Sequence, residues 1–199
     1  MKKIISVILV LACMLSLAAC NFNLGGLVPV TAESFKQAMD ATNPGKVTIT
    51  TTTVTAGLGT LNANYAVTYN SDNTATIKYD CELWAGIPTD GSAISPDAKE
   101  KLSGTVTRDA SGAYSDASFV EDVELALSLN IGAISTYTIS EDGKTFTANV
   151  AKDSTAAVFG VAYDFDVQIT VVKGANVINS IALAYTAGNN DVSIKCIYD

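Results

Sequence analysis

Phe165-Asp-Val-Gln-Ile-Thr-Val171 is the stretch that decides the fold, because apolar and polar side chains alternate along its whole length. This alternation is typical of a β-strand with one buried face and one solvated face. Residues 181–185 and 192–196 repeat the pattern after turn sequences at 174–176 and 188–189. The sequence therefore predicts a three-stranded meander with one apolar face. The expected cross-strand neighbours are Ile169 and Ile181, Val167 and Leu183, Phe165 and Tyr185, Tyr185 and Val192, Leu183 and Ile194, and Ile181 and Cys196.

The chain upstream of this meander also has the character of a β-protein. Residues 47–54 form a run rich in β-branched side chains, which favours a strand. Residues 65–69 and 75–83 alternate in polarity on either side of a turn at Ser71-Asp72-Asn73. This turn places both apolar sets on one face and predicts a hairpin. Its expected pairs are Tyr69 with Ala75, Val67 with Ile77, and Tyr65 with Tyr79.

Two further hairpins are predicted in the middle of the chain. One joins residues 102–108 to a segment that begins at Ala113, around a turn at 110–112. In the other, Tyr137 and Ile139 face Phe146 and Ala148, and Asp142-Gly143 is the central dipeptide of a type I′ turn.

Short helices are predicted in three places. Thr31 can cap a helix that carries Phe35, Ala38 and Met39 on one stripe and ends before Asn43-Pro44. Ser118 and Glu121 have the spacing of a capping box, which predicts a helix over about 119–129. One or two helical turns are expected over 153–159, ending at Gly160.

Together these elements predict an α+β domain. About nine or ten strands, mostly joined in hairpins, form a strongly curved antiparallel sheet that resembles a half-barrel. Two or three short helices are expected to pack on one face, because one-sided apolar strands need a cover. Residues 85–100 are the longest irregular stretch. Two interpretations of it stay open, a lid or binding loop and a solvated insertion without a role.

The N-terminus has the three parts of a secretory signal peptide. Lys2 and Lys3 precede an almost wholly apolar run, and Leu17-Ala-Ala-Cys20 closes it with small residues. This site resembles the lipobox of bacterial lipoproteins. The resemblance implies that residues 1–19 are removed and that Cys20 becomes the lipid-modified first residue. Residues 20–30 are then a short tether, and residues 31–199 a single extracytoplasmic domain held at the cell membrane or envelope.

The charge of the chain limits its partners. Processing at Cys20 leaves 10 basic and 20 acidic side chains, a net charge of about −10. Nucleic acid and anionic bilayer surfaces would repel such a domain. The expected partners are the membrane, through the lipid on Cys20, and either a hydrophobic small molecule or an envelope protein.

The four cysteines reduce to two after processing. Cys13 lies in the signal peptide and Cys20 carries the lipid, which leaves Cys81 and Cys196. Outside the cytoplasm an even pair is compatible with a disulfide. Two buried thiols are the other reading, because free cysteine packs as a small apolar residue. The sequence leaves both alternatives open.

Candidate chemistry is sparse. The sequence contains no histidine, which excludes Ser-His-Asp and Cys-His nucleophile activation and histidine-ligated zinc. No catalytic residues, metal site or cofactor are therefore predicted. Asp164 and Asp166 place two carboxylates on one strand face, which suits a hard cation or acid–base work, but the solvated face of a strand explains them better. Trp84 and the eight tyrosines could stack on glycan, although several tyrosines fall on predicted core faces.

The order of elements over about residues 31–199 resembles that of half-barrel lipoprotein carriers and chaperones of the LolA and LppX type. In that family a concave sheet and its helices enclose a cavity for acyl chains. The resemblance rests on element order and on no motif, so it assigns no functional residue.

Three functions follow from these patterns. The sequence favours a membrane-anchored extracytoplasmic lipoprotein with a non-enzymatic binding or structural role. A carrier of hydrophobic ligands in a cavity between sheet and helices is the alternative. A hydrolase that uses carboxylates ranks third.

Overall fold

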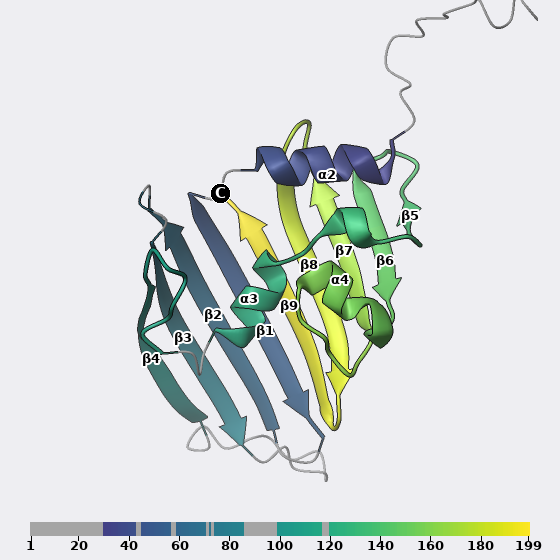
Figure 1. Ribbon diagram of the computed structural model, residues 1–199. Coiled ribbons are helices and arrows are strands. Elements are labelled where there is room, and N and C mark those ends of the chain that lie inside the picture. Colours follow the sequence, from purple (N-terminus) through teal and green to yellow (C-terminus); the bar gives the residue numbers. More distant parts are fainter. Residues whose placement is uncertain are drawn as a thin grey trace, which may run out of the picture. The chain divides into compact units, whose positions relative to one another are not determined.

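Nine antiparallel strands form one open sheet in the computed structural model of this chain (Figure 1). The structure describes residues 30–42, 45–56, 59–70, 72, 74–85, 99–116 and 120–199. The elements in chain order are α2 (Ala32–Ala41), β1 (Lys46–Thr55), β2 (Gly59–Tyr69), β3 (Ala75–Ala85), β4 (Lys99–Arg108), α3 (Glu121–Leu127), η2 (Ile131–Ala133), β5 (Thr138–Ile139), β6 (Thr145–Val150), η3 (Lys152–Ser154), α4 (Thr155–Phe159), β7 (Val167–Lys173), β8 (Ile178–Ala187) and β9 (Asn190–Tyr198).

The spatial order of the strands is β4-β3-β2-β1-β9-β8-β7-β6-β5. Every neighbouring pair from β1 to β4 and from β5 to β9 is consecutive in sequence. The two halves meet where β1 pairs with β9, with Ile49 opposite Cys196. The prediction of a largely antiparallel sheet built from hairpins is therefore confirmed. Residues Thr31–Asp199 form one compact unit.

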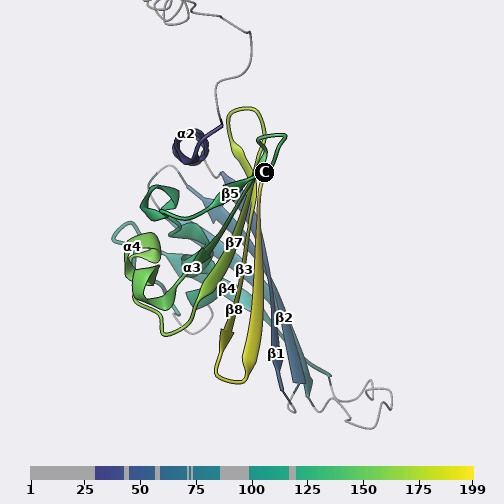
Figure 2. The same cartoon turned by 90° about the vertical axis from the view of Figure 1, so that its right-hand side faces the viewer.

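Alternation along the strands separates a buried face from a polar one. Val167, Ile169 and Val171 of β7 are at most 1% exposed, whereas Gln168 between them is exposed. The buried positions of α2, α3 and α4 belong to the same apolar cluster as the buried positions of the strands. Figure 2 draws these three helices to the same side of the sheet. The opposite face of β6–β9 and β1 carries the side chains described below.

The hairpin of β2 and β3 has the predicted register, with Val67 opposite Ile77 and Tyr65 opposite Tyr79. The register of β8 and β9 is also as predicted, with Leu183 opposite Ile194. Gly188, in the turn between them, has a φ of +61°. This value lies in the left-handed region that glycine adopts without strain.

The predicted register of β7 against β8 is wrong by two residues. Ile169 lies opposite Leu183 and Val171 lies opposite Ile181. The loop is longer than the predicted three-residue turn, since the Gly174 N–H donates to the Val177 carbonyl, and the pairing shifts again between Val172 and Lys173. A shift of two residues keeps every side chain on its own face. The apolar pattern therefore does not distinguish the two registers.

Two other predicted hairpins differ from the structure. After β4, the described residues up to 116 turn back on the strand through a bridge between Arg108 and Tyr114 and the Ser115 N–H to Thr107 carbonyl hydrogen bond, but they form no second strand. Between β5 and β6, Ile139 pairs with Phe146 as predicted. However, the Gly143 N–H donates to the Ser140 carbonyl, so Asp142-Gly143 is not the central dipeptide of a type I′ turn. Asp142 instead accepts the Lys144 N–H and the Ser140 hydroxyl.

The helices start and end close to the predicted residues. Thr31 occupies the N-cap position of α2, but its side chain makes no capping hydrogen bond; the Ser34 hydroxyl donates to the Thr31 carbonyl instead. α4 ends at Gly160, whose φ of +76° is left-handed as predicted for a helix stop. The predicted Ser118 cap of α3 and most of the 85–100 stretch lie outside the described residues.

Cys81 and Cys196 are both free and buried, so the disulfide alternative is wrong. Cys81 lies on β3 and Cys196 on β9, with β2 and β1 between them. Neighbouring strands are about 4.8 Å apart, which separates the two thiols by about 14 Å. A disulfide requires Cα atoms within about 7 Å. Both cysteines face the core, but they lie on strands that are not adjacent.

We expect both thiols to react with a thiol reagent only after the domain unfolds. Burial raises the pKa of the Cys196 thiol to about 11, so the unreactive neutral form persists well above neutral pH. This folded pKa exceeds the unfolded value of about 8.5. The neutral thiol therefore adds to the free energy of unfolding below about pH 8.5, and this contribution is lost as the pH rises toward 11. Urea unfolding at several pH values across this range measures the loss of unfolding free energy. This thiol alone contributes a slope of about 1.4 kcal/mol per pH unit.

The matched variant for this measurement is Cys196→Ala, which removes the titrating group. Its free energy of unfolding should fall less steeply with pH than that of the wild type. Rapid labelling of Cys196 in the native protein at pH 8 would contradict the burial on which this prediction depends.

Candidate binding groove on the sheet

A groove crosses the face of the sheet opposite the buried face. It consists of three hollows of about 840, 270 and 510 Å³. The first and second share Thr52, Gln168, Ala184 and Ser193, and the second and third share Gln168 and Thr170. We call this continuous hollow surface the groove.

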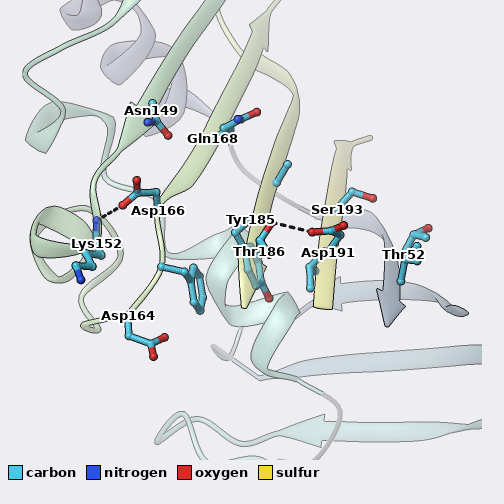
Figure 3. A pocket seen from close by; sticks show the side chains of 14 residues that line it. Thr52, Asn149, Lys152, Asp164, Asp166, Gln168, Tyr185, Thr186, Asp191 and Ser193 are labelled. Atoms are coloured by element: carbon cyan, nitrogen blue, oxygen red, sulfur yellow. Dashed lines mark hydrogen bonds between the residues drawn. The ribbon is translucent and has the colours of Figure 1, made fainter. Parts of the chain in front are cut away.

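The register of the strands places one row of side chains straight across the groove. The row runs from β6 to β1 with one residue on each strand: Asn149, Gln168, Ala184, Ser193 and Thr52. Figure 3 labels the four polar members of this row, with the strand of Ala184 between Gln168 and Ser193. A second row lies two residues further along the strands and consists of Thr147, Thr170, Ala182, Lys195 and Thr50.

Small side chains on β8 explain why this surface is hollow. Ala182 and Ala184 face away from the core on β8; Ala184 lies between Gln168 and Ser193, and Ala182 lies between Thr170 and Lys195. A residue without a long side chain at the centre of a sheet leaves a depression between its neighbours. The floor of the groove is therefore set by two alanines.

Several polar side chains of the groove make no hydrogen bond within the described part of the chain. These are Asn149, Gln168 and Ser193 in the first row and Thr50 and Thr170 in the second. The Thr52 hydroxyl, by contrast, donates to Asn62 Oδ1 at 2.9 Å. Five hydroxyl or amide groups are thus available to a ligand.

The end of the groove nearest the β8–β9 turn carries charge. The Thr186 hydroxyl donates to Asp191 Oδ1 at 2.7 Å, and the Lys152 backbone N–H donates to Asp166 Oδ1 at 2.9 Å (Figure 3). Asp164 also lines this end and is exposed. Asp164 and Asp166 precede β7, so the prediction that both lie on one face of a strand is wrong.

The segment that brings Asp164 and Asp166 to the groove is held by one buried threonine. Thr155 is fully buried; its hydroxyl donates to the Lys152 carbonyl at 2.7 Å and accepts the Tyr163 N–H at 2.8 Å. The ring of Phe165 then stacks on Tyr185, with centroids 4.2 Å apart and an interplanar angle of 8°. These contacts hold the segment that carries Asp164 and Asp166 against β8 at this end of the groove.

Among the described residues, no three histidine, cysteine or acidic side chains gather where they could hold a metal ion. The described helices are also all too short or too polar to span a bilayer. The predicted lipidation site, Cys20, lies outside the described residues.

Sequence reasoning missed the groove because it followed the buried face. The signal was present in Ile181-Ala-Leu-Ala-Tyr185, where alanine takes both outward positions of a central strand. Outward positions of a one-sided strand are usually polar. Two alanines there indicate a depression, but only the neighbouring strands reveal its length.

Comparison with known proteins adds little. No protein-family model matches the sequence, and no curated protein matches it. Among solved structures, the chain is similar to a redesigned β-barrel, mFAP1, bound to DFHBI, with 12% identity and a TM-score of 0.23 over 85% of this chain and 99% of that chain. This likeness is too slight to carry an argument about fold or function.

Proposed function

We propose that this chain is a lipid-anchored extracytoplasmic binding protein, non-enzymatic, whose ligand site is the groove. The sheet then acts as a curved half-barrel with helices covering one face, which leaves the opposite face for the ligand. The lipobox-like sequence ending at Cys20 supports the anchor. The observation that carries the binding role is the set of polar side chains in the two rows, on β6, β7, β9 and β1, that make no hydrogen bond within the described residues.

The state of the carboxylates favours binding over acid–base catalysis. Asp164, Asp166 and Asp191 are all exposed, and two of them already accept hydrogen bonds from the protein. These aspartates fit better as hydrogen-bond acceptors for a ligand.

Replacing Cys20 with alanine should release the protein from membranes. Without the thiol no lipid is attached, and the mature domain retains no other expected anchor. The measurement is the distribution of the protein between sedimented membranes and the soluble fraction, together with the mass of its N-terminal peptide. Cys13→Ala is the control, since that residue lies in the removed signal peptide and should leave the distribution unchanged. An unmodified Cys20 on the wild-type mature protein would refute the anchor.

Binding at the groove can be tested without knowing the ligand. A chemically diverse set of small-molecule fragments is titrated into the mature protein in detergent, and amide chemical shifts locate the contacts. Hits should cluster on β6–β9 and β1. Ala184→Trp fills the floor of the groove and should abolish these shifts. Ala66→Trp changes an exposed alanine on the same face of β2, outside the groove, and should not. Hits that avoid the groove would contradict its assignment as the ligand site.

A second candidate function is the carriage of hydrophobic ligands on the buried face of the sheet. Leu61, Leu83 and Leu102 point to that face but are 37%, 39% and 47% exposed, and Leu61 and Leu83 are directly paired across β2 and β3. Neighbouring exposed leucines indicate an apolar contact surface. Saturable uptake of a fluorescent fatty acid that Leu83→Ser weakens would support this candidate, and the absence of saturable uptake would eliminate it.

A further inference from the structure

We propose that the ligand of the groove is a neutral linear saccharide that lies across the strands. This inference rests on the proposed function, because it takes the groove as the binding site and names the chemistry that fits it. Its support comes from the repeat of the polar rows and the composition of the lining.

The repeat of the rows matches a polymer of sugar units. Adjacent strands are about 4.8 Å apart, so each row offers one side chain every 4.8 Å across β6, β7, β8, β9 and β1. One pyranose unit of an extended chain has a similar length. A linear saccharide lying perpendicular to the strands therefore meets a new side chain with each unit, except over the alanine floor, where its rings can sink in.

The lining offers the groups that hydroxyls require. The amides of Asn149 and Gln168 each provide two donors and an acceptor, and the hydroxyls of Thr50, Thr170 and Ser193 can do both. A sugar hydroxyl is likewise both donor and acceptor. Every one of these protein groups is uncommitted within the described residues.

Other ligand classes fit this surface less well. An extended peptide binds a sheet through backbone hydrogen bonds at an edge, but β7, β8, β9 and β1 are each paired on both sides. An acyl chain would cover hydroxyls and amides without satisfying them. An anionic ligand would meet an excess of carboxylates, because Asp164, Asp166 and Asp191 line the groove against only two of its lysines, Lys152 and Lys195.

The test is calorimetric titration of the mature protein in detergent with neutral oligosaccharides of glucan, mannan, xylan and chitin type, each in increasing length. At least one series should bind saturably, with affinity that rises with chain length up to about five units, one for each strand crossed. Ala184→Trp should weaken binding by about tenfold or more. Ala66→Trp, and Ser103→Ala on the same face of β4, should leave it unchanged.

Three outcomes overturn the inference. The first is that no series binds while fragments still bind in the groove, which leaves the proposed function intact. The second is that affinity does not depend on chain length beyond a single unit, which excludes a ligand lying across the strands. The third is that an anionic saccharide binds more tightly than its neutral counterpart, which contradicts the charge argument. If fragments also fail to bind the groove, the proposed function fails with the inference.

Discussion

Replacing Ile49 with aspartate is expected to prevent folding. Ile49 is fully buried on β1 and lies between Tyr65 of β2 and Cys196 of β9. A carboxylate there would lose its hydration without gaining a partner, and a protonated carboxyl would still be an unpaired polar group in the core. The cost of several kcal/mol is comparable with the total stability of a typical domain, about 5–15 kcal/mol.

Thr48→Asp is the matched control for this prediction. Thr48 is the preceding residue on β1 and is exposed on the opposite face, so its substitution should change stability by only about 0.5 kcal/mol. Soluble yield and far-ultraviolet circular dichroism distinguish the two variants. A folded Ile49→Asp protein would show that the pairing of β1 with β9 is not the core of the sheet.

Phe146→Ala should lower the free energy of unfolding by about 3–5 kcal/mol, the usual cost of removing a buried phenylalanine ring. Phe146 of β6 is fully buried, with Phe35 of α2 on one side at 5.5 Å and Tyr137 on another at 5.0 Å. Its ring thus joins the first helix to a strand more than a hundred residues later. Urea unfolding followed by circular dichroism gives the loss.

Two further variants test whether the loss comes from the cavity. Phe146→Leu refills much of the space and should cost clearly less than Phe146→Ala. Leu102→Ala removes an apolar side chain that is already 47% exposed, so its cost should stay near 1 kcal/mol. Similar losses for Leu102→Ala and Phe146→Ala would mean that burial does not determine these effects.

Local patterns predicted the strands well because each strand carries its own evidence of which side is buried. The alternation through Val167, Ile169 and Val171 holds for any partner strand, so the strands and their buried faces follow from sequence. Pairing within hairpins was recovered where the turn is short, as between β8 and β9. It was wrong by two residues between β7 and β8, because a longer loop and an irregularity at Lys173 leave the apolar pattern unchanged.

The groove could be predicted only in part. Its polar side chains and the two alanines of β8 are visible in the sequence as the outward half of the alternation. The registers of four strand pairs together decide that a single row contains Asn149, Gln168, Ser193 and Thr52. An error of two residues in any one of them, such as the one made for β7 and β8, moves part of the row to a different place along the groove.

Sequence alone was enough to find most of the strands and their buried faces, because each depends on residues close together in the chain. Only the tertiary structure decided that β1 pairs with β9, which joins the two halves of the sheet. Strands so far apart in the chain pair because this buries the apolar faces of both. The hydrophobic effect is not directional, so an apolar pattern does not specify which strand will be its partner. The same choice placed Cys81 and Cys196 three strands apart, and it set the rows of the groove side by side.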